Sequence, residues 1–82
     1  MLIKILNLTS FRCPDTMIYL KKNIKYIQFP EIVLIISNDI STTWDIPLFC
    51  NFMNYKLIKK YIKTKPYQFL IQKKKEEMLH RI

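Results

Sequence analysis

Residues 14–36, PDTMIYLKKNIKYIQFPEIVLII, change from a helical to a strand-like hydrophobic pattern. Apolar residues in the first half recur at i, i+3, i+7 and i+10, on one face of a helix: Met17, Leu20, Ile24 and Ile27. Pro30 ends that pattern, and an unbroken apolar run follows over residues 32–36. We therefore predict a helix that begins at Pro14 and then a strand buried on both sides.

The sequence on either side supplies the remaining elements. Upstream, residues 2–8 form a short apolar run suited to a strand. Downstream, Asn38-Asp39 predicts a turn, and Thr42 or Thr43 caps a second helix, with Pro47 better placed if Thr43 is the cap. The apolar stripe of this helix consists of Ile46, Phe49, Cys50 and Met53.

Two further strands are predicted, over residues 56–62 and 67–73, joined by a hairpin at residues 63–66. The order βαβαββ gives an α/β chain, more narrowly an α+β two-layer sandwich, with both helices on one face of a four-stranded mixed sheet. Parallel pairing of the first two strands would make their connection a right-handed crossover. A chain of 82 residues encloses one core, so we expect one domain over residues 1–75 and a charged tail over 76–82 that frays or extends the last strand.

Composition excludes several classes of protein. Two cysteines and one histidine are too few for a structural zinc site, and no CxxC pair is present, so we expect neither a metal nor another cofactor. No apolar run is long enough to span a membrane, and no signal peptide is recognised, so we expect a cytoplasmic protein. The net charge of +8 favours an anionic partner, but the abundance of Ile, Lys and Asn without Gly also fits an A/T-biased genome.

Cys13 is the candidate reactive residue. Pro14 suits the first helical position, so Cys13 is expected at the N-cap with its sulfur beside the free amides of Asp15 and Thr16. Those amides, the helix dipole and Arg12 would stabilise a thiolate, with Asp15 opposing them in part. Such a residue fits a persulfide carrier, although a cysteine that merely caps or packs fits nearly as well.

Cys50 has the opposite character. It lies on the apolar stripe of the second helix, where a free cysteine behaves as a small hydrophobic residue, so we expect it in the core.

Three segments resemble the TusA/SirA sulfur-carrier family. They are Leu6-Asn7-Leu8-Thr9-Ser10-Phe11-Arg12-Cys13-Pro14, then Asn38-Asp39-Ile40-Ser41-Thr42-Thr43-Trp44-Asp45-Ile46-Pro47-Leu48-Phe49-Cys50, and finally Pro66-Tyr67-Gln68-Phe69-Leu70-Ile71-Gln72-Lys73. The resemblance runs from about residue 2 to residue 75, in the family's order and spacing. It implies a βαβαββ sandwich similar to the C-terminal domain of translation initiation factor 3.

The same resemblance implies a function. Cys13 would carry the persulfide, and Pro14 would be the first proline of the family's Cys-Pro-x-Pro motif. The donor would be a cysteine desulfurase and the acceptor the TusBCD complex, through TusD, in a relay that ends in 2-thiolation of the tRNA wobble uridine. We expect no direct binding to tRNA.

Three positions depart from the family pattern. Thr16 replaces the second proline, Ser10 replaces a glycine that a loop with positive φ would need, and Ile40 replaces a proline. We expect the amide of Thr16 to be unpaired, so that proline would be tolerated there.

Two other functions fit the same residues. A basic nucleic-acid-binding module would explain the charge but gives Cys13 no role and lacks a recognisable stacking motif. A thiol-based regulatory protein would use Cys13 without transferring sulfur.

Overall fold

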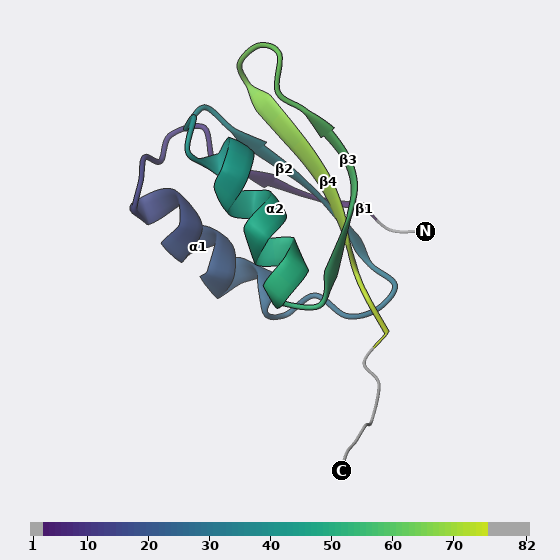
Figure 1. Cartoon of the computed structure of the whole chain (residues 1–82). Helices are drawn as coiled ribbons and strands as arrows, with labels where there is room; N and C mark the ends of the chain where they lie inside the picture. Colours follow the sequence, from purple (N-terminus) through teal and green to yellow (C-terminus); the bar gives the residue numbers. More distant parts are fainter. Residues whose placement is uncertain (1–2, 76–82) are drawn as a thin grey trace.

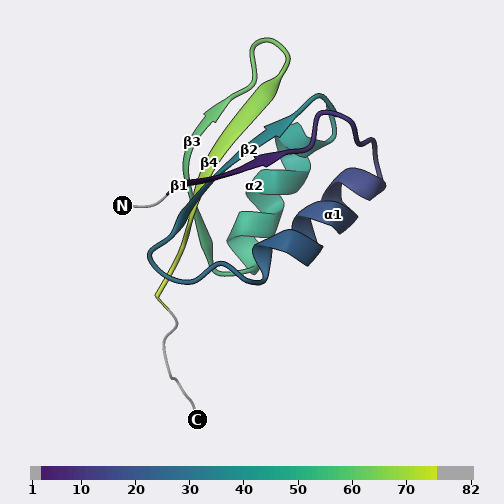
Figure 2. The same cartoon turned by 180° about the vertical axis from the view of Figure 1, so that it is seen from behind.

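The computed structural model describes residues 3–75, which fold in the predicted order βαβαββ. The elements are β1 (Ile3–Asn7), α1 (Asp15–Ile24), β2 (Ile32–Ser37), α2 (Thr42–Phe52), β3 (Tyr55–Tyr61) and β4 (Tyr67–Lys73). Both helices lie on one face of the sheet, and no helix within residues 3–75 lies on the opposite face (Figures 1 and 2). The predicted two-layer α+β sandwich is confirmed; residue 2 and the predicted tail over 76–82 lie outside the described residues.

The sheet brings three connecting segments to one edge. Its strand order is β1-β2-β4-β3, with β1 parallel to β2 and the other pairs antiparallel. Because β1 and β2 are parallel, the segments that follow them leave from the same edge, where the chain continues into α1 and α2. Ser37, at the end of β2, pairs with Tyr67, the first residue of β4, so the β3–β4 hairpin also lies at this edge.

The strand β2 is buried more deeply on one face than on the other. Val33 and Ile35 are buried against the helices; on the other face Ile32 is buried, whereas Leu34 and Ile36 are half-buried. The prediction of a strand buried on both sides therefore holds only in part. Both helices lie on the same side of the sheet, so the second face has no helix of residues 3–75 over it (Figure 2).

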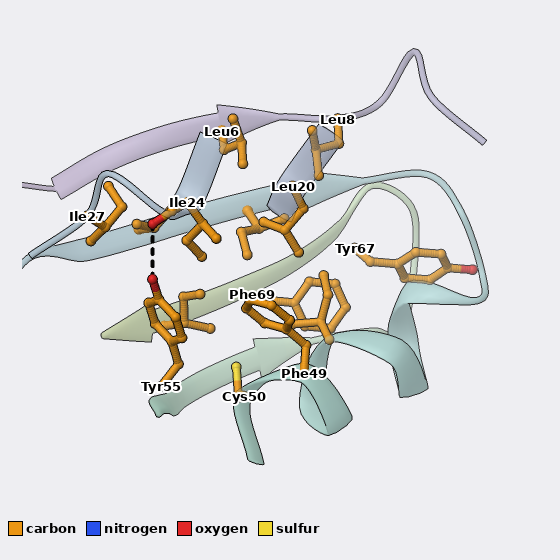
Figure 3. Close-up of a cluster of buried hydrophobic side chains, with 14 residues drawn as sticks. Leu6, Leu8, Leu20, Ile24, Ile27, Phe49, Cys50, Tyr55, Tyr67 and Phe69 are labelled. Atoms are coloured by element: carbon orange, nitrogen blue, oxygen red, sulfur yellow. Dashed lines mark hydrogen bonds between the residues drawn. The ribbon is translucent and has the colours of Figure 1, made fainter. Parts of the chain in front are cut away.

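The core fills the space between the helices and the sheet (Figure 3). Its fully buried side chains include Leu8, Leu20, Ile35, Ile46, Phe69 and Ile71. At its margin, the hydroxyl of Tyr55 donates a hydrogen bond of 3.0 Å to the carbonyl of Ile24, at the end of α1. This bond satisfies one of the carbonyls that a helix end leaves free, and it joins the start of β3 to α1.

Both helices begin and end differently from the prediction. The helix α1 ends at Ile24, and Ile27 is buried from the turn that follows, where its amide donates to the Ile24 carbonyl. In α2, Ser41 occupies the N-cap position, so neither threonine caps the helix and Pro47 lies in its interior. Met53 follows α2 and is 54% exposed rather than part of the core.

Candidate functional site

Cys13 lies exposed in the loop between β1 and α1. Phe11 anchors the loop to α1. Its side chain is half-buried and stacks on Tyr19, with the ring centroids 4.4 Å apart. The amide of Phe11 also donates to the carbonyl of buried Leu8. The backbone before Cys13 is thus fixed to the core while the cysteine faces solvent.

Cys13 does not cap α1. The helix begins at Asp15, and Pro14 occupies the N-cap position with φ −90° and ψ −2°. The amides of Asp15 and Thr16 both donate to the carbonyl of Arg12, at 2.7 and 3.2 Å. The amides that were expected to be free for the sulfur are therefore already paired, because the turn at Pro14 brings the Arg12 carbonyl over the start of the helix.

Asp39 holds the start of α1 against the turn after β2. The buried hydroxyl of Thr16 donates to its Oδ2 at 3.2 Å, and the amide of Ser41 donates to its Oδ1 at 3.0 Å. The backbone amide of Cys13 also hydrogen-bonds to this carboxylate. Burial raises the pKa of Asp39, but these hydrogen bonds outweigh it, so the pKa lies below its ordinary value of 3.8.

A second contact ties the same two segments together. The side-chain amide of Asn38 donates to the carbonyl of Thr9 at 3.5 Å. The carboxamide oxygen of Asn7 in turn accepts from the amide and the hydroxyl of Thr9, at 3.0 and 2.7 Å. The loop that carries Cys13 is therefore braced on one side by the turn after β2.

Cys13 lines two hollows of different chemistry. One, of about 710 Å³, has a mixed polar and apolar lining and is formed by Thr9, Phe11, Arg12, Cys13, Asn38, Asp39, Ile40 and Lys65. The other, of about 520 Å³, runs between the helices and is lined by Cys13, Pro14, Met17, Lys21, Asp45, Leu48, Phe49, Phe52 and Met53. We call the second one the apolar groove. A partner can therefore reach the sulfur across either surface.

Cys50 is 3% exposed and packs in the core, as predicted (Figure 3). Burial raises the pKa of its thiol to about 11, with Lys74 acting weakly in the other direction. Cys50 is thus a protonated, enclosed thiol under ordinary conditions. Cys13 is the one cysteine that a partner can touch.

The residues described offer no metal site, since no three His, Cys, Asp or Glu side chains gather closely enough in 3–75 to hold an ion. Within the same range, neither helix has the length and hydrophobicity needed to cross a membrane.

A comparison with known families identifies the family of the chain. The family model described as sulfurtransferase TusA matches residues 4–73. The chain belongs to the TusA sulfurtransferase family. The match covers the Cys13 loop, both helices and nearly all of the four strands.

The departures from the family pattern do not distort the loop. Among residues 3–75, Asn54 is the one non-glycine residue with positive φ, so Ser10 adopts an ordinary conformation where the family has glycine. Ile40 is exposed, and its carbonyl accepts from the amide of Thr43 at the start of α2. Thr16 differs from the expectation, because both its amide and its hydroxyl are hydrogen-bonded.

Several site residues were not predicted. The sequence assigned Asp39 only to a turn, and nothing in the chain order brings Lys65 of the hairpin close to Cys13. Leu48 and Phe52 lie off the single apolar stripe used to predict α2, yet they are 51% and 75% exposed beside Cys13. The sequence signal that could have revealed them is the presence of large apolar residues on the face of α2 predicted to be exposed to solvent.

Proposed function

We propose that this chain accepts sulfane sulfur from a cysteine desulfurase as a persulfide on Cys13 and passes it into a relay for 2-thiolation of the tRNA wobble uridine. The observation that carries the proposal is the contrast between the two cysteines of a sulfurtransferase-family chain, one exposed at a braced loop and the other enclosed in the core. The proposed acceptor is the TusBCD complex, through TusD.

The chemistry requires only thiol exchange. The Cys13 thiolate attacks the terminal sulfur of the donor's persulfide, a new S–S bond forms on Cys13, and the donor cysteine leaves as a thiolate. At the next step Cys13 is the donor: an acceptor thiolate attacks the terminal sulfur on Cys13, and Cys13 leaves as a thiolate. The transfer causes no net oxidation.

The burial of Cys50 protects this intermediate. A neighbouring thiol would attack the inner sulfur of the persulfide, form a disulfide and release sulfide. Cys50 is 3% exposed and its thiol has a raised pKa, so it supplies no thiolate near neutral pH. The persulfide therefore persists until a partner docks.

The apolar groove supports docking of a protein partner. Leu48, Phe52 and Met53 are each more than half exposed, although side chains of this kind are usually buried. They lie together beside Cys13, with Lys21 at the rim. An apolar surface with a charged rim is the usual anatomy of a protein interface.

The test is mass spectrometry of the intact protein after incubation with a desulfurase and cysteine. We expect a gain of one sulfur atom in the wild type and in Cys50→Ala, and no gain in Cys13→Ala. A sulfur adduct that persists in Cys13→Ala, or none in the wild type, would refute the proposal. Transfer of labelled sulfur from the loaded protein to TusD, compared with transfer to free thiols, tests the acceptor.

A further inference from the structure

The lysines of this chain are concentrated in its second half. Residues 46–75 contain no Asp or Glu but carry Lys56, Lys59, Lys60, Lys63, Lys65, Lys73, Lys74 and Lys75. All of them are exposed except Lys73, which is half-buried. The next acidic residues after Asp45 are Glu76 and Glu77. Codon bias enriches lysine along a whole chain, whereas this stretch of 30 residues combines eight lysines with no acidic residue. Because these lysines lie together without acidic residues, β3, the hairpin and β4 form a strongly basic region, which we call the basic ribbon.

This ribbon borders the uncovered face of the sheet. Lys56 pairs with Gln72 and Lys59 pairs with Leu70, in register with the side chains of β2 that point away from the helices. Tyr61, paired with Gln68 and 47% exposed, lies on the same face. A hollow of about 480 Å³ lies here, lined by Leu34, Lys59, Lys60, Tyr61, Gln68 and Leu70.

The chemistry of this surface fits a single-stranded nucleic acid. Lysine ammonium groups contact backbone phosphates, an exposed aromatic ring stacks on a base, and amide side chains hydrogen-bond to base edges. An acidic protein surface would satisfy the lysines but gives no role to the ring or to the uncharged amide of Gln68. The amide of Gln72 already donates to the carbonyl of Pro30 at 3.0 Å. Tyr61 is the exposed ring on this face, and the sequence alone did not single it out as a candidate for stacking.

We propose that the open face of β4 and β3 binds single-stranded RNA, with Lys56 and Lys59 on phosphates and Tyr61 stacked on a base. The choice of RNA over DNA rests on the proposed function, whose relay ends on tRNA. This proposal replaces the expectation of no direct RNA contact. The binding surface lies on the face opposite the helices and does not include Cys13.

The test is fluorescence anisotropy of the full chain with a labelled twelve-nucleotide oligouridylate, measured over a range of salt concentrations. We expect Tyr61→Ala to weaken binding by ~5-fold or more and Tyr61→Phe to preserve it. Lys56→Ala/Lys59→Ala should reduce the slope of log K against log salt by about 1.4, because each lost phosphate contact on a single strand contributes ~0.7. The matched control is Lys22→Ala in α1 together with Lys25→Ala at the C-cap of α1, and this pair should leave the slope nearly unchanged.

Three results would overturn the proposal. The first is no binding at low salt, and the second is equal weakening by the two lysine pairs, which would indicate charge alone. The third is that oligothymidylate or labelled polyglutamate binds at least as tightly as oligouridylate and is weakened by the Lys56→Ala/Lys59→Ala change. Cys13→Ala should bind RNA like the wild type, so failure of RNA binding and failure of sulfur transfer are read separately.

Discussion

At the scale of single residues, the two cysteines differ in everything that controls thiol reactivity. Cys13 is exposed, whereas Cys50 is buried and its pKa is raised to about 11. We expect a thiol reagent at pH 8 to modify Cys13 in the folded protein at least ~10-fold faster than Cys50, because only a thiolate in contact with solvent reacts. Peptide mass spectrometry after timed labelling measures both rates.

The control for this prediction is the unfolded chain. In denaturant the two cysteines should react at similar rates, since the difference arises from folding. Equal rates under native conditions would contradict the assignment of Cys13 as the accessible thiol and of Cys50 as a core residue.

A second prediction at this scale concerns the Thr16–Asp39 hydrogen bond. Thr16 is fully buried and its hydroxyl donates to the carboxylate that also binds the amide of Cys13. Thr16→Val keeps the shape but removes the donor, and we expect it to lower the free energy of unfolding by about 1 kcal/mol and to slow sulfur acceptance. Denaturant unfolding and the rate of mass gain measure the two effects.

Thr16→Ser is the matched control, because it keeps the hydroxyl. It should retain the rate of sulfur acceptance more fully than Thr16→Val. If both variants accept sulfur at the wild-type rate, the bond contributes to stability alone and does not position the Cys13 loop.

At the scale of elements, the sequence predicted the features that depend on hydrophobic periodicity. The strand over 67–73 was predicted with its exact bounds, and the apolar faces of both helices were found because they repeat at the helical spacing. The helix starts were not, because local hydrogen bonds fix them: Asp39 binds the amide of Ser41, and the Arg12 carbonyl binds the amides that were assigned to the sulfur. Hydrophobic periodicity carries no information on such bonds between polar groups.

The residues of the candidate site also fall into a predicted group and an unpredicted group. Cys13 was predicted from its local context and from the family resemblance. Its neighbours across the apolar groove were not, because Phe52 is brought to Cys13 by the packing of α2 beside α1. A prediction based on one apolar stripe ignores apolar residues outside that stripe. In the fold these residues lie next to Cys13.

The groove gives a prediction for α2. Phe52→Ala should weaken binding to the desulfurase by about tenfold with little loss of stability, because Phe52 is 75% exposed and contributes little to the core. Charge reversal at Lys21, on the rim, should weaken docking similarly. Titration of the desulfurase by calorimetry, beside thermal unfolding of each variant, measures both properties.

Phe49→Ala is the contrasting variant on the same helix. Phe49 is 7% exposed and stacks on Tyr55 at 5.6 Å, so its loss should lower the free energy of unfolding by about 3 kcal/mol. A large drop in melting temperature for Phe52→Ala as well would show that Phe52 is packed and would contradict the docking role.

At the scale of the whole molecule, the fold keeps its two candidate surfaces apart. The thiol and the apolar groove lie at the helical layer, whereas Lys56, Lys59 and Tyr61 lie on the opposite face of the sheet. Figures 1 and 2 show the two layers. Lys65 lines the hollow of about 710 Å³ at Cys13 from the hairpin, so the basic ribbon reaches the same end of the molecule as the thiol. The proposed RNA surface and the proposed site of sulfur exchange therefore lie on different faces of one small domain.

The pH dependence of folding also follows from the whole structure. The pKa of Asp39 is lowered from 3.8, so its contribution to stability is present above pH 3.8 and is lost as the pH falls through the lower folded value. The pKa values of Cys50 and Tyr55 are raised, mainly by burial. Their contributions are present at neutral pH and are lost at high pH, so stability should reach a plateau between about pH 4 and pH 9.

The alkaline limb of that curve can be assigned to a residue. Between pH 9.0, the ordinary pKa of a thiol, and about pH 11, its value in the folded chain, Cys50 is ionised in the unfolded state but protonated in the native state. The native state then binds more protons, so raising the pH favours unfolding. From pH 8 to pH 10 the wild type should lose about 1 kcal/mol more than Cys50→Ala loses, whatever the starting stability of that variant. Urea unfolding at pH 7, 8, 9 and 10 gives both curves, and parallel curves would show that Cys50 can ionise within the folded core.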